Sequence, residues 1–136
     1  MVVDLINVMG ILDVARRLYQ YLTNQSRSIR RDRREKVAGY FDQIALTLHD
    51  TASILRRGEI PHGFCGRMEG YSDQVSDTIV DVIGTEMAEE LSNKLRDAHV
   101  KERAAFDDEN KGQMIDGLDE AAGYFEASAD SVRAAK

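Results

Sequence analysis

A histidine and a cysteine three residues apart come closest to a catalytic pattern in this sequence. His62 and Cys65 lie within residues 61–66, and an imidazole beside a thiol can lower the thiol pKa and create a nucleophile. The segment holds no third group that would orient the histidine, and its glycines favour a tight connection between helices. We therefore interpret Cys65 as a small buried thiol near a helix connection, with catalysis by this pair as the less favoured alternative.

Metal and phosphate chemistry have equally little support. Di-iron bundles use a Glu-x-x-His spacing on each of two helices, whereas this chain has one such spacing, from Glu59 to His62, with Pro61 inside it. His49 and His99 share no ligand spacing and are expected at the edges of the core. The single cysteine excludes an intramolecular disulfide and a zinc site with two or more thiolates. Glycine-rich phosphate loops are also absent, so the sequence predicts no enzyme and no cofactor.

An apolar helix tip followed by a basic run is the pattern most typical of an interaction site. On a helical wheel, Val2, Ile6 and Met9 project to the side that becomes polar later in the same helix. Such a tip must be buried, paired with a second copy or inserted into another phase. The basic run, residues 27–36, holds six basic and two acidic residues, and each basic residue contributes roughly 1 kcal/mol at an anionic membrane surface. Five of the six are arginines: Arg27, Arg30, Arg31, Arg33 and Arg34.

The charge distribution limits the choice of partner. The net charge is −6, but residues 1–36 carry +4 and the other hundred residues carry −10. An acidic body repels both nucleic acid and anionic membrane over most of its surface, whereas the basic N-terminal segment can bind either one locally. Against nucleic acid, the basic run lacks the interleaved aromatic residues of a single-strand binder. We expect an anionic membrane surface or a protein as partner, and no nucleic acid. The N-terminus lacks a basic region before its apolar residues and falls short of a membrane span, which predicts a cytoplasmic, peripherally membrane-bound protein.

The elements that must position these residues are helices. Strand signals are absent, and apolar residues recur at helical spacing over residues 2–22, 37–57, 64–83, 86–105 and 113–134. In the second of these segments a 4,3 spacing forms a continuous seam of Val37, Phe41, Ile44, Leu48, Thr51 and Leu55. Gly58 and Gly84 are expected to end helices, and residues 107–112 are interpreted as a turn. Where the second helix begins relative to the basic run stays open.

Short connections predict that helices adjacent in sequence pack antiparallel. The expected fold is therefore all-α, a single up-and-down antiparallel bundle of four to five helices spanning residues 1–136. Within it we expect an N-terminal helix over about residues 2–23, the basic stretch at residues 27–36 and a four-helix bundle over residues 37–136. The N-terminal helix either packs along that bundle as a fifth element or replaces one arm of it.

The order of apolar helix, basic stretch and helical bundle resembles the HeLo-type N-terminal domains of cell-death and immune proteins. The resemblance rests on residues 2–22, on the basic run and on the apolar seams, and it covers most of the chain at the level of pattern. It implies a bundle that is held inactive, then oligomerises and engages membrane. Val2, Ile6 and Met9 would then form the inserting tip, and the five arginines would face lipid.

Two functions follow as hypotheses. In the first, the domain targets or perturbs membranes through its N-terminal helix and the basic run, and deletion of residues 1–24 abolishes lipid binding but leaves a folded bundle. In the second, the domain is a soluble adaptor or homo-oligomer with the apolar tip buried in a symmetric interface. The same deletion then produces a monomer or an unfolded chain.

Overall fold

The structure, a computed structural model, describes residues 2–25, 30–59, 63–97 and 108–134, with side-chain surroundings from Gly10 onward in the first helix. These residues form six helices and no strand, which confirms the all-α prediction. The helices are α1 (Val2–Gln25), α2 (Arg31–Arg56), α3 (Phe64–Thr78), α4 (Val80–Ile83), α5 (Thr85–Arg96) and α6 (Asp108–Ala134). The short α4 leaves five long helices in the bundle.

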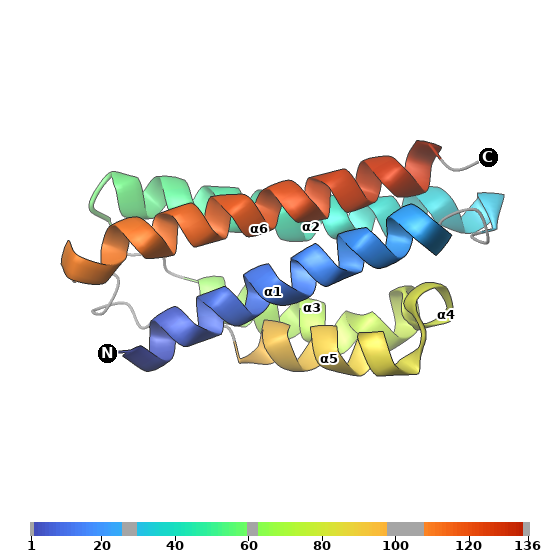
Figure 1. Cartoon of the computed structure of the whole chain (residues 1–136), viewed down its shortest axis with the longest axis horizontal. Coiled ribbons are helices and arrows are strands. Elements are labelled where there is room, and N and C mark those ends of the chain that lie inside the picture. Colours follow the sequence, from blue (N-terminus) through green and yellow to red (C-terminus); the bar gives the residue numbers. More distant parts are fainter. Residues whose placement is uncertain (1, 26–29, 60–62, 98–107, 135–136) are drawn as a thin grey trace.

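The five long helices form a closed ring. Successive helices alternate in direction, so that α1 and α6 run the same way and α2 runs opposite to both (Figure 1). The principal contacts lead from α1 to α6, then to α2, α3 and α5, and back to α1. The first helix is therefore a fifth member of the bundle. The expectation that sequence neighbours pack together is wrong for α1 with α2 and for α5 with α6. Instead, α6 packs between α1 and α2, and α1 packs between α6 and α5.

The core consists of the apolar seams that the periodicity predicted. Every member of the α2 seam is buried, and Phe41 meets Phe125 of α6 with ring centroids 6.2 Å apart. The first helix also contributes to this core. Ile11, Leu18 and Leu22 have no exposed area, so α1 cannot leave the bundle without opening its centre to water.

A polar contact joins each pair of neighbouring helices in the ring. Such contacts add direction and register to an interface whose stability comes mainly from apolar burial. The five are Arg16 with Tyr124 (α1–α6), Arg133 with Glu35 (α6–α2), Tyr40 with the Tyr71 carbonyl (α2–α3), Ser72 with Ser92 (α3–α5) and Glu90 with Arg17 (α5–α1).

Several helix boundaries differ from the prediction. The helix expected over residues 64–83 is divided at Ile79, whose φ of −133° lies outside the helical range. The turn expected at residues 107–112 is wrong from Asp108 onward, since α6 begins there. Acidic residue types also suit the first turn of a helix, so their presence did not distinguish a turn from a helix start. Gly58 and Gly84 end helices as predicted, with φ of +74° and +83°.

Candidate functional site

The basic run is partly helical. Because α2 begins at Arg31, residues 31–36 form its first turns, while Arg30 is the residue before the helix and has an extended backbone. We call residues 30–36 the basic end of the bundle. Arg27 lies outside the described residues. Arginines at a helix start oppose the positive end of the helix dipole, so local helix stability does not account for them.

Two arginines of the basic end point to solvent. Arg30 has 79% of its side chain exposed and pairs with Asp32 over 3.2 Å, and Arg31 is also exposed. An exposed ion pair of this kind contributes about 0 to 1 kcal/mol and exchanges readily for another anion. The guanidinium groups of Arg30 and Arg31 are therefore accessible to a partner. Arg34 is half-buried and has an interaction of its own.

A third arginine, Arg33, forms hydrogen bonds to another part of the folded chain. Arg33 donates hydrogen bonds to the carbonyl oxygen of Thr78, at 2.7 Å, and to Asp81 Oδ1, at 2.8 Å. Only 23% of its side chain is exposed. Thr78 is the last residue of α3, where carbonyl groups lack intrahelical donors, and a basic side chain can satisfy them. Arg33 was predicted to face lipid, and in this structure it closes the C-terminus of α3.

One of the two acidic residues of the basic end, Glu35, pairs with an arginine of α6. Arg133, near the end of α6, binds Glu35 at 2.7 Å and Asp42 at 2.7 Å. The hydrogen bond from Arg133 lowers the pKa of Glu35 below its usual value. Glu35 is thus paired with α6, which leaves the arginines of the basic end less neutralised by their own segment.

The apolar tip lies at the other end of the molecule. Val2, Ile6 and Met9 belong to the start of α1, and their side-chain surroundings are outside the described part. The start of α1 and the start of α2 lie at opposite ends of the bundle (Figure 1). A helix of 24 residues is about 36 Å long, so a membrane that meets the basic end head-on does not meet the tip.

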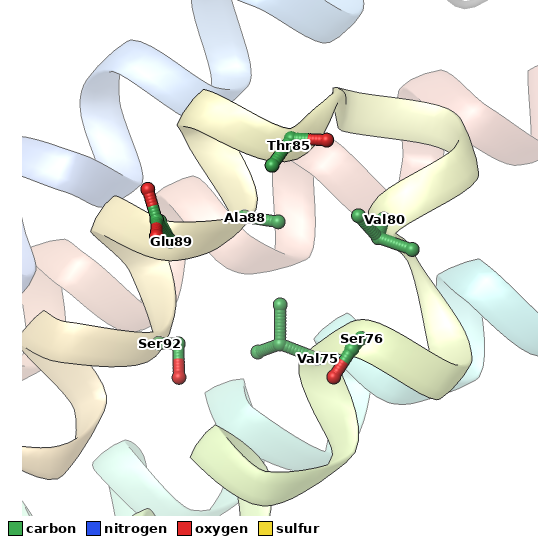
Figure 2. Close-up of a pocket in the computed structure, with 7 residues that line it drawn as sticks. All are labelled: Val75, Ser76, Val80, Thr85, Ala88, Glu89 and Ser92. Atoms are coloured by element: carbon green, nitrogen blue, oxygen red, sulfur yellow. The ribbon is translucent and has the colours of Figure 1, made fainter.

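A small apolar pocket lies between parts of α3, α4 and α5. Its volume is about 170 Å³, and Val75, Val80 and Ala88 provide its apolar walls, with Ser76, Thr85, Glu89 and Ser92 around them. Val75 points across the space toward Ala88 (Figure 2). The lining therefore combines apolar walls with three hydroxyl groups and one carboxylate.

One titratable cluster joins α2 to α6. His49 Nδ1 lies 3.0 Å from Asp119, and Nε2 bonds to Glu126, while Arg56 also binds Asp119. Partial burial lowers the pKa of His49, but its hydrogen bonds to Asp119 and then to Glu126 outweigh it, and the net shift is upward. His49 therefore lies at the edge of the α2–α6 core, as expected. No group of three or more acidic, histidine or cysteine residues within the described chain is arranged to hold a metal.

The predicted histidine–cysteine pair lies largely outside the part of the chain that the structure describes. His62 and the side chain of Cys65 lie outside the described residues, as does His99. Glu59, the acidic member of the Glu-x-x-His spacing, is exposed and pairs with Arg57 over 3.4 Å. Neither the catalytic nor the metal alternative gains a geometric argument from these positions.

Among the helices that the structure describes, none combines the length and apolar character needed to cross a bilayer. Comparisons of the chain with protein-family models, with curated proteins and with solved structures gave no match.

Proposed function

We propose that this chain is a non-catalytic interaction domain that binds anionic membrane surfaces electrostatically through the basic end of its bundle. The observation that carries the proposal is the exposure of Arg30 and Arg31 at the start of α2, at one end of a body whose residues 37–136 carry −10. Pairing of Glu35 with Arg133 supports it, because one of the two carboxylates in residues 30–36 is engaged by α6, while Asp32 pairs with Arg30.

In this proposal the basic end contacts the membrane and the apolar tip does not take part in the same contact. The opposite placement of their helix starts argues against a single head-on contact that uses both (Figure 1). The buried residues of α1 argue against its release as an anchor. Electrostatic binding by a few arginines, at roughly 1 kcal/mol each, is weak and falls steeply with salt. The HeLo-type resemblance agrees with a basic surface that engages lipid.

Co-sedimentation with vesicles tests the proposal. The full chain is mixed with phosphatidylcholine vesicles with and without phosphatidylserine, at low and physiological salt. We expect binding only with phosphatidylserine, and weaker binding as salt rises. The double variant Arg30→Glu/Arg31→Glu should lose it. Because acidic residues favour a helix start, this variant should fold normally.

A variant of equal net charge is the control. Arg67 and Arg96 are exposed on α3 and α5, and Arg67→Glu/Arg96→Glu should keep vesicle binding. Equal loss in both double variants would mean that net charge alone matters and would overturn the site. If the full chain stays in the supernatant under every condition, the proposal fails, and a dimeric mass in solution would then favour the adaptor hypothesis, with the tip in a symmetric interface.

A further inference from the structure

The one-turn helix α4 is held in place mainly by its neighbours. It spans Val80–Ile83, between the non-helical Ile79 and Gly84, whose φ is +83°. Isolated turns of this length are unstable in water. Ile79 and Ile83 are buried and fix its inner side. On its outer side, Asp81 is exposed and binds Arg33 from the basic end.

Arg33 bridges the break between α3 and α4. Its hydrogen bonds reach the Thr78 carbonyl on one side of Ile79 and Asp81 on the other. Asp81 has an alternative partner in water, since 56% of its side chain is exposed, and Arg33 itself has 23% of its side chain exposed. A phosphate or carboxylate that binds guanidinium through two oxygens can therefore compete for Arg33.

The α3–α5 pocket depends on the position of α4. Val80 supplies one of its walls and stands opposite Val75 and Ala88 (Figure 2). In this structure, Val75 and Ala88 are buried. Outward movement of α4 would remove the Val80 wall and expose both of these side chains.

We infer that Arg33 couples the basic end to the α3–α5 pocket, so that an anionic lipid headgroup which engages Arg33 releases α4 and uncovers the apolar surface of Val75, Val80 and Ala88. This inference rests on the proposed function. It adds a second, apolar component to a contact that begins electrostatically, and durable membrane association generally needs two such components.

Hydrogen–deuterium exchange of the α4 amides in the full chain tests the coupling. In buffer, Asp81→Ala should raise the exchange rate of residues 80–84 about threefold or more, because one charged hydrogen bond of α4 is lost. Asp77→Ala is the control, since Asp77 is exposed one turn earlier and is not a partner of Arg33. With the unsubstituted chain, phosphatidylserine-containing vesicles should produce the same increase and phosphatidylcholine vesicles should not.

The outcomes separate the two proposals. Vesicle binding with unchanged exchange in α4 overturns the coupling and leaves the proposed function standing. Unchanged exchange in Asp81→Ala, with a normal circular dichroism spectrum, also overturns the coupling. Absence of binding to phosphatidylserine-containing vesicles overturns the proposed function and the coupling together.

Discussion

Ser72 of α3 and Ser92 of α5 hydrogen-bond to each other in both directions. Ser72 Oγ lies 2.8 Å from the Ser92 carbonyl oxygen and 2.8 Å from Ser92 Oγ, and Ser92 Oγ donates to the Ser72 carbonyl at 3.2 Å. Hydroxyl groups inside helices usually bond to the carbonyl four residues earlier, as Thr51 does. These two instead bond across the interface, which requires small side chains on both helices.

Enlarging Ser72 should therefore separate α3 from α5. We expect Ser72→Ala to lower the free energy of unfolding by about 1 kcal/mol through lost hydrogen bonds. Ser72→Leu should lower it by about 1–3 kcal/mol more, because Ser72 is buried and the larger side chain overpacks the interface. Urea unfolding measures both. Ser76, exposed one turn later, is the control, and Ser76→Leu with a loss as large as that of Ser72→Leu would contradict the argument.

The burial of α1 predicts the effect of a single truncation. Leu18 has no exposed area and Leu46 is 62% exposed. Leu18→Ala should cost about 2–5 kcal/mol because it leaves a cavity in the core. Leu46→Ala should change stability by less than about 0.5 kcal/mol. For the same reason, deletion of residues 1–24 should unfold the chain. A cooperative thermal transition in the deleted protein would refute this placement of α1.

The backbone conformation at position 84 favours glycine. Its φ of +83° and ψ of 159° belong to a region that residues with a Cβ rarely adopt. Gly84→Ala should cost about 1–3 kcal/mol. Gly123 lies on the exposed side of α6 with open space around a Cβ, and Gly123→Ala should add about 0.5–1 kcal/mol. The melting temperatures of the two variants should shift in opposite directions. Shifts of the same sign would contradict the backbone conformation described for Gly84.

The His49 cluster predicts a pH dependence. Both ring nitrogens face carboxylates, of Asp119 and Glu126, and carboxylates only accept hydrogen bonds, so the cationic imidazolium fits best. The pKa of His49 is raised in the folded chain. Its contribution to stability is therefore fully present below the ordinary histidine pKa of about 6.5 and is lost as the pH rises through the folded value.

Urea midpoints measured from about pH 6 to about pH 9 should show this loss. His49→Gln removes the titrating group while leaving a polar side chain, and it should flatten the profile over this range. His62 and His99 remain in both proteins as internal controls. An identical fall of the midpoint in the variant would assign the pH dependence to another group.

Local patterns determined the helices of this protein. The 4,3 spacing of the α2 seam depends only on the geometry of one helix, and all its members are buried as that geometry requires. Gly58 and Gly84 end helices because glycine adopts a positive φ without steric strain. This preference is local and does not depend on contacts with other helices. The concentration of arginines over residues 27–36 and the acidic balance of the rest are likewise properties of the chain itself.

Only the tertiary structure decided how these helices meet. The ring order, with α6 against both α1 and α2, depends on which apolar faces fit, and helical periodicity carries no information on that choice. Arg33 acquires its role through a contact with Thr78, 45 positions later in the chain and next to the interruption at Ile79. The sequence alone shows which residues make up the apolar tip and the basic end. Their separation by the length of α1 became visible only in three dimensions, because distance within a bundle depends on helix direction as well as on position along the chain.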